Sequence, residues 1–113
     1  MKEFLLVFRA DIKNLPKGSP EEMQALTKTW MDWIGGIAAQ GKLADRGNRL
    51  MHEGKVLRSD AVITDGPYSE IKESILGYSL IKANSLEEAT ALAKGCPVFK
   101  TNGSVEVREL SPM

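Results

Sequence analysis

A four-residue pattern that occurs twice marks the start of two helices and constrains the fold more than any other feature. Ser19-Pro20-Glu21-Glu22 and Ser85-Leu86-Glu87-Glu88 both place a glutamate three residues after a serine. In such a capping box the serine hydroxyl accepts a hydrogen bond from the backbone N–H three residues later. Pro20 also suits the first helical position. With Gly41 and Gly95 as stops, the sequence predicts two helices, each between its serine and its glycine.

Apolar side chains recur at helical spacing along the first predicted helix, and they form one stripe that is expected to face the core. The stripe consists of Met23, Leu26, Trp30, Trp33, Ile34 and Ile37. Trp30 and Trp33 serve either as core or interface anchors or as a stacking surface for a ligand. Gly35 and Gly36 cost the helix about 1 kcal/mol each. They therefore indicate either close approach of another backbone or a kink.

Extended segments surround the two helices. Residues 2–9 are a short run of aromatic and branched side chains, and later segments alternate between apolar and polar residues. In the fourth segment, Leu76, Tyr78 and Leu80 share one face, and Gly77 indicates a bulge or a close neighbour. The predicted strands cover residues 2–9, 43–51, 55–64, 75–82 and 103–110.

The order of these elements is β-α-β-(β)-β-α-β. Right-handed crossovers then predict an α+β, ferredoxin-like fold, with an antiparallel sheet and both helices on one of its faces. The other face of the sheet would carry apolar side chains without cover. Two such sheets packed face to face would cover both, so we expect a homodimer.

Composition limits the classes of function. The 113 residues suit a single domain covering 1–113, and 15 basic residues balance 15 acidic ones without a block of like charge. Nucleic acid and anionic membranes are therefore not expected as partners. No apolar run approaches the roughly 20 residues of a membrane helix, and the N-terminal run is too short for a signal peptide. A single cysteine forbids an internal disulfide. We expect a cytoplasmic protein.

The segment from Thr64 to Glu73 has residue types too particular to be explained by core filling. Its Asp-Gly-Pro start is typical of a rigid turn, and polar residues follow directly. Asp65 acts either as a general base or ligand-orienting carboxylate, or as a cap of the turn through its own side chain. Tyr68 either lines a pocket or holds the loop against the core. Glu70, Lys72 and Glu73 form either the rim of a site or a solvated set of ion pairs.

Three arginines lie at or near predicted strand ends. Arg9, Arg46 and Arg49 either grip a ligand carboxylate bidentately or form ion pairs inside the protein or at an interface. The single histidine, His52, is interpreted as a solvent-exposed turn residue. The residues predicted to bind a ligand are Arg9, Trp30, Arg46, Asp65, Tyr68, Glu70 and Lys72, and Asp65 is the candidate for catalysis.

No metal or cofactor is expected. One histidine and one cysteine do not make a zinc site within one subunit, and Cys96 is interpreted as structural because its neighbours do not favour a thiolate. The sequence also contains no phosphate loop and no dinucleotide-binding fingerprint.

The chain resembles the YCII-related family, in the branch called DGPF-domain proteins. The matching stretches are Thr64–Glu73, Gly77-Tyr78, Ser85–Ala89, Cys96-Pro97 and Gly103–Arg108. The resemblance implies a dimeric α+β barrel of ferredoxin-like subunits. Most members of the family have no established activity, and the few enzymes among them act on small cyclic or chlorinated aromatic breakdown products with a His and an Asp.

The chain departs from that enzymatic pattern. The enzymatic relatives carry the histidine on the first helix, whereas residues 21–40 contain none and Trp30 and Trp33 occupy the middle of this helix. The His–Asp mechanism is therefore not carried over, and whether the protein is an enzyme stays open.

Three functions remain from the sequence. The first is a small-molecule binder or enzyme, with its site between the first helix and the sheet or at the dimer barrel, and with Asp65 and an arginine as polar anchors. The second is an accessory interaction module linked to transcription, because the resemblance includes members encoded near or fused to sigma factors. The third is a structural dimer without catalysis.

Overall fold

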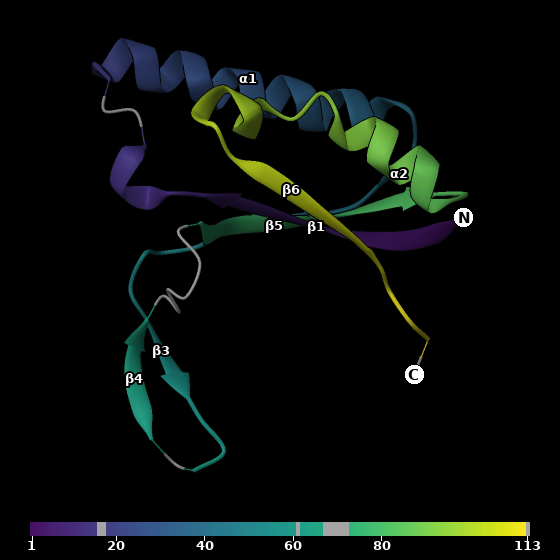
Figure 1. Cartoon of the computed structure of the whole chain (residues 1–113). Helices are drawn as coiled ribbons and strands as arrows, with labels where there is room; N and C mark the ends of the chain where they lie inside the picture. Colours follow the sequence, from purple (N-terminus) through teal and green to yellow (C-terminus); the bar gives the residue numbers. More distant parts are fainter. Residues whose placement is uncertain (16–17, 61, 67–72, 113) are drawn as a thin grey trace.

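The computed structural model describes residues 1–15, 18–60, 62–66 and 73–112 (Figure 1). The strands are β1 (Lys2–Ala10), β2 (Leu43–Arg49), β3 (Gly54–Leu57), β4 (Ile63–Gly66), β5 (Ser74–Ala83) and β6 (Ser104–Glu109). The helices are α1 (Pro20–Ala39) and α2 (Leu86–Ala93), with short 3₁₀ helices η1 (Ile12–Asn14) and η2 (Pro97–Thr101).

Four strands form one antiparallel sheet in the order β2-β5-β1-β6. Both α1 and α2 lie on the same face of this sheet (Figure 1). The strand order places β5 between β1 and β2, the strands that α1 connects, which is the split β-α-β arrangement of a ferredoxin-like fold. The predicted α+β fold class is confirmed.

The two capping boxes begin the helices as predicted. The Ser19 hydroxyl accepts a hydrogen bond from the Glu22 backbone N–H at 3.2 Å, and the Ser85 hydroxyl accepts one from the Glu88 N–H at 3.1 Å. Gly41, just beyond α1, has a φ of +71°, a conformation that glycine adopts without steric cost.

The core lies between the helices and one face of the sheet. Phe4, Leu6 and Phe8 of β1 point into it and are nearly or completely buried. Ile81 of β5 and Val98 of η2 pack against them. The two helices cover the core on one side, and their buried residues are Ile37 on α1 and Ala89 and Ala93 on α2.

The interpretation of Gly35 and Gly36 as a close-packing site is wrong for the described chain. A methyl group at either position would meet no described atom within 4 Å outside the helix's own backbone. Helix α1 nevertheless runs unbroken through both glycines over its 20 residues. The presence of glycines in a helical sequence does not show which side of the helix they occupy. Here both glycines lie on the exposed side.

The single extended segment predicted for residues 55–64 is also wrong, because the chain reverses within it. Strands β3 and β4 form a separate two-stranded hairpin in which Leu57 lies opposite Ile63. The Arg58 backbone N–H donates to the Val62 carbonyl at 2.9 Å, and the Asp60 carboxylate accepts from the Val62 N–H at 3.1 Å. This local side-chain bond closes the turn.

Gly77 marks both a register shift and a close neighbour. The pairing of β1 with β5 passes from Gly77 to Ile75, so Leu76 is the extra residue of a bulge. A side chain on Gly77 would lie 2.6 Å from the Asn48 carbonyl oxygen. The bulge also separates Leu76 from Tyr78 and Leu80. Leu76 packs against the core, so the prediction that all three share a face is wrong.

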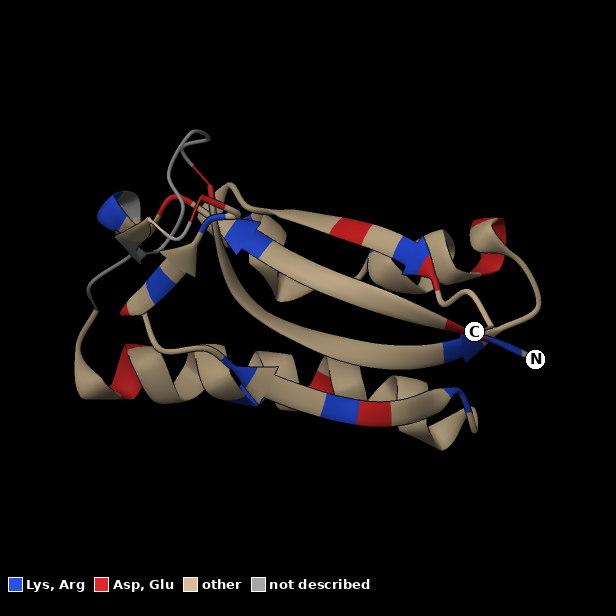
Figure 2. Ribbon diagram, turned by 90° about the horizontal axis from the view of Figure 1, so that it is seen from below, with Lys and Arg blue, Asp and Glu red and all other residues tan. Residues whose placement is uncertain are grey.

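The face of the sheet opposite the helices is not covered by any described helix. Leu5 and Val7 of β1 lie beside Leu80 and Tyr78 of β5 on this face, and all four side chains are half-buried. Figure 2 shows this face with charges of both signs interspersed along the strands. The β3–β4 hairpin projects on the same side (Figure 1). No helix among the described residues is long and apolar enough to cross a membrane.

Candidate functional site

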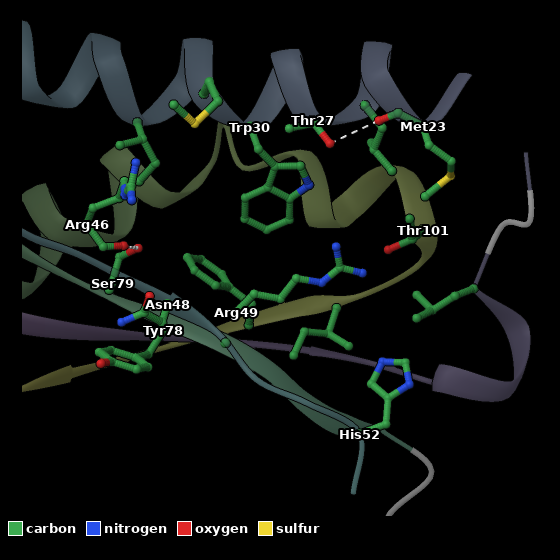
Figure 3. A pocket seen from close by; sticks show the side chains of 18 residues that line it. Met23, Thr27, Trp30, Arg46, Asn48, Arg49, His52, Tyr78, Ser79 and Thr101 are labelled. Atoms are coloured by element: carbon green, nitrogen blue, oxygen red, sulfur yellow. Dashed lines mark hydrogen bonds between the residues drawn. The ribbon is translucent and has the colours of Figure 1, made fainter. Parts of the chain in front are cut away.

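A cavity of about 410 Å³ lies between α1 and the edge of the sheet formed by β2 and β5 (Figure 3). Its volume falls within the range of small-molecule sites, and its lining is mainly apolar. The lining residues are Phe8, Leu15, Met23, Leu26, Thr27, Trp30, Met31, Ile34, Arg46, Gly47, Asn48, Arg49, His52, Leu76, Gly77, Tyr78, Ser79 and Thr101.

An irregularity in β2 shapes the floor of the cavity. Arg46 and Gly47 together lie opposite Ser79, so β2 carries one extra residue at this point. Gly47 has a φ of +72°, and any side chain there would collide with the Tyr78 carbonyl group. The Ser79 hydroxyl donates to the Arg46 carbonyl at 2.7 Å, and the Asp45 carboxylate accepts from the Gly47 N–H at 2.7 Å. These bonds hold the bulge in place.

The bulge sets which side chains of β2 face α1. Arg49 lies opposite Gly77, on the helix side of the sheet, whereas Asn48 lies opposite Tyr78. Figure 3 shows the Asn48 and Tyr78 side chains pointing away from α1, so these two residues contribute backbone to the cavity floor. Arg46 and Arg49 extend on the helix side, and His52 lies just beyond the end of β2 (Figure 3).

The apolar wall is built around an aromatic cluster. Phe8 meets Trp30 edge to face with ring centroids 5.0 Å apart, and Trp30 meets Trp33 in the same way at 5.9 Å. Trp33 donates its indole N–H to the Leu92 carbonyl at 3.1 Å, which ties α1 to α2. The Trp30 indole N–H has no hydrogen-bond acceptor within the described part of the chain. The Trp30 side chain extends from α1 into the cavity (Figure 3).

The polar wall is basic. Arg46, Arg49 and His52 line the cavity, and no Asp or Glu among the described residues does so. Neither arginine forms an ion pair with a described residue. The Thr27 and Thr101 hydroxyls already donate to the backbone carbonyls of Met23 and Val98. The cavity therefore offers hydrogen-bond donors on one side and aromatic and aliphatic surface on the other.

The structure brings together some of the residues predicted to bind a ligand and separates others. Trp30 and Arg46 line the cavity. His52 is exposed, as predicted, and also lies at the cavity wall. Arg9 lies on the opposite face of the sheet, where its guanidinium forms an ion pair with Glu106 at 3.3 Å. The ion-pair alternative therefore describes Arg9.

The motif segment lies mostly outside the described residues. Tyr68, Glu70 and Lys72 are not among them. Asp65 belongs to β4, where its backbone lies opposite Lys55, and its side chain is outside the described part. The Asp-Gly pair thus ends a strand, where the sequence predicted the start of a turn. Glu73, at the far end of the segment, accepts a hydrogen bond from the Ser104 hydroxyl at 2.7 Å.

Sequence reasoning missed much of the cavity wall on α1. The apolar stripe predicts that Met23, Leu26 and Ile34 face the core, yet they line the cavity. Ile37 is the one buried residue of this 20-residue helix. The signal was present in the length of the apolar stripe, which extends over more turns of α1 than the buried core covers.

Cys96 lies away from the cavity, at the start of η2. It is buried, and burial raises the pKa of its thiol to about 12. A thiol with such a pKa stays protonated and weakly nucleophilic, in agreement with its interpretation as structural. The described residues contain no cluster of three or more His, Cys, Asp or Glu side chains placed to hold a metal ion.

Comparison with known proteins identifies the family to which this chain is related. Residues 4–113 match the profile of the YCII-related domain, which covers nearly the whole chain. The chain belongs to the YCII-related family. An uncharacterised protein of Rhizobium meliloti (strain 1021) is 40% identical over 53 residues, which span 46% of this chain and 43% of that protein. The relative carries no assigned activity, and the cavity of this chain is the feature that bears on its function.

Proposed function

We propose that this YCII-related protein binds a small organic compound in the cavity between α1 and the β2–β5 edge, as a binder or as an enzyme. The cavity of about 410 Å³, with an aromatic wall facing a basic wall, is the observation that supports this function. Pockets that combine apolar surface with a few convergent polar groups are the usual form of small-molecule sites. A compound with one ring, such as a cyclic or aromatic-derived metabolite, suits the proposal.

The residues divide into two roles under this proposal. Trp30 and Phe8 provide the surface for the apolar body of the ligand, and Arg46 and Arg49 provide its polar anchors. A chemical step would also need a group that moves a proton, for which the sequence nominates Asp65. The proposal of binding does not depend on that step.

A pair of matched threonine variants tests this site. Thr27 lines the cavity from α1, and Thr90 lies on α2; both are exposed, and both hydroxyls donate to the carbonyl four residues earlier. Ligand-observed NMR screening with one-ring compounds would first identify a compound that binds the wild-type chain. Thr27→Phe should fill part of the cavity and abolish binding of that compound. Thr90→Phe should leave that binding unchanged. Equal binding by wild type and Thr27→Phe would place the compound elsewhere.

We also propose that the protein is a homodimer that covers the open face of the sheet. Leu5, Val7, Tyr78 and Leu80 form an apolar strip on that face, without cover from a described helix. The hairpin on the same side carries exposed Leu57 and Ile63, with 71% and 64% of their surfaces accessible. Two sheets that pack face to face would remove both apolar surfaces from water.

The finer family placement stays part of the proposal. The string Asp65-Gly66-Pro67 supports the DGPF branch, and the low cysteine content, with Cys96 alone, supports a cytoplasmic location.

A further inference from the structure

We infer that the cavity takes an organic anion, namely a compound with a carboxylate head and a flat apolar body, bound with the carboxylate at Arg49 and the body against Trp30. The inference rests on the proposed function, because it names the ligand class of the same cavity.

The first argument comes from hydrogen-bond chemistry. The indole of Trp30 and the guanidinium groups of Arg46 and Arg49 can only donate hydrogen bonds, and none of them has a partner within the described part of the chain. The cavity hydroxyls of Thr27 and Ser79 already donate to backbone carbonyls. A ligand that satisfies these free donors must bring acceptors, and a carboxylate brings two oxygens with about four acceptor positions.

The second argument comes from charge. Both arginines are cationic, and no acidic residue among the described lining neutralises them. Arg9 illustrates the contrast, because its guanidinium on the other face of the sheet pairs with Glu106 at 3.3 Å. An anionic head would take the place that Glu106 takes for Arg9. A guanidinium can hold both oxygens of a carboxylate at once, which gives orientation as well as affinity.

The third argument concerns the body of the ligand. Phe8 and Trp30 present aromatic surface, and Met23, Met31 and Leu26 add flexible aliphatic surface around it. Aromatic rings stack on such walls, and methionine adapts to irregular shapes. Figure 3 shows Arg49 reaching from β2 toward the same space into which Trp30 hangs. A head held at Arg49 therefore leaves the ring of the same molecule beside Trp30.

Paired acids and amides test the inference. Isothermal titration of the full chain would compare 3-phenylpropionate with 3-phenylpropanamide, and indole-3-acetate with indole-3-acetamide. Each pair has the same body and differs only in its head, which is a charged carboxylate with two acceptor oxygens in the acid and a neutral amide with one acceptor oxygen and an NH2 donor in the amide. The acids should bind at least about tenfold more tightly than the amides, since hydrogen bonds to charged groups are roughly twice as strong as neutral ones.

Two arginine variants locate the effect. Arg49→Gln should weaken the acids about tenfold and change the affinity of the amides by less than about threefold. Arg108→Gln is the matched control, because Arg108 lies on β6, is exposed, and pairs with Glu106 at 3.0 Å away from the cavity. This control should leave both series unchanged.

The outcomes separate the two proposals. Equal binding of acids and amides, or equal loss in both arginine variants, would overturn the anion inference and leave the cavity as a site for neutral compounds. Absence of binding by every acid and every amide would overturn both the inference and the proposed small-molecule function. Preferential binding of the acids, lost on Arg49→Gln alone, would support both.

Discussion

Trp30 and Trp33 show at the scale of single residues how a site arises from an otherwise ordinary helix. They are three positions apart on the same apolar stripe, and their rings touch at a centroid distance of 5.9 Å. The Trp33 indole N–H donates a hydrogen bond to the Leu92 carbonyl, whereas the Trp30 indole N–H has no acceptor among the described residues. Sequence reasoning could not separate the two, because the difference depends on where the end of α2 meets α1 in the folded chain.

Substitution of each tryptophan by phenylalanine should show that Trp33 contributes mainly to stability and Trp30 mainly to ligand binding. Trp33→Phe leaves the Leu92 carbonyl without its donor, and we expect it to cost about 1 kcal/mol more unfolding free energy than Trp30→Phe. Trp30→Phe should weaken binding of a cavity ligand, while Trp33→Phe should not. Urea unfolding followed by circular dichroism and calorimetric titration of the same variants measure both effects. The reverse ranking in either measurement would contradict these roles.

At the scale of elements, what the sequence predicts well is local. A capping box needs only four consecutive residues, so the starts of α1 and α2 could be predicted from Ser19 and Ser85. The bulge in β2 could not, because Gly47 is recognised only against the Tyr78 carbonyl on the neighbouring strand. The hairpin was also missed, since its apolar residues continue on both sides of the Ser59-Asp60 turn. The cavity floor depends on the non-local features, so the sequence nominated Arg46 without showing where it lies.

Helix α2 is joined to the residue just before β2 by an ion pair whose effect on stability should depend on pH. Glu88 Oε1 is enclosed and lies 2.9 Å from Lys42 Nζ. The close contact of the Lys42 ammonium group is the main cause that lowers the pKa of Glu88 below the ordinary 4.5. A carboxyl group whose pKa is lower in the folded state than in the unfolded state stabilises the fold at pH values above its unfolded-state pKa. This stabilisation is lost as the pH falls through the folded-state pKa.

Glu88→Gln should therefore reduce the pH dependence of the unfolding free energy below pH 4.5. Near neutral pH the variant should be less stable than wild type, and the two should converge on acidification. Glu87→Gln, a neighbouring exposed position, is the control and should follow the wild-type curve. Parallel curves for Glu88→Gln and wild type, measured by urea unfolding between pH 7 and pH 2, would show that the Lys42 contact does not stabilise the fold.

At the scale of the whole molecule, the chain forms a flattened layer structure that is complete on one side only. Its principal extents are 44 × 43 × 18 Å, with helices over one face of the sheet and none described over the other. The ferredoxin-like order of elements was predictable because two helix starts and alternating strands leave few topologies. The sequence predicts that the apolar face of the sheet opposite the helices must be covered. That a second copy of the chain covers it remains a prediction.

The homodimer should appear directly in the mass of the particle. We expect size-exclusion chromatography with light scattering to give twice the chain mass of 12.4 kDa. Leu80→Arg places a charge on the open face and should shift the protein toward the monomer. Leu86→Arg, at a 49% exposed position on α2 outside that face, should remain dimeric. A wild-type mass of 12.4 kDa would contradict the proposed dimer.

The central claim is that ligands bind in the cavity beside Trp30, and the two indole N–H groups report on it directly. A ¹⁵N–¹H correlation spectrum of the labelled chain should contain one indole signal from each tryptophan, and Trp30→Phe and Trp33→Phe assign them. On titration with indole-3-acetate the Trp30 signal should move, because its ring lines the cavity, while the Trp33 signal, whose N–H donates to the Leu92 carbonyl, should stay in place. A calorimetrically observed binding event that leaves the Trp30 signal unmoved, or moves only that of Trp33, would contradict the account.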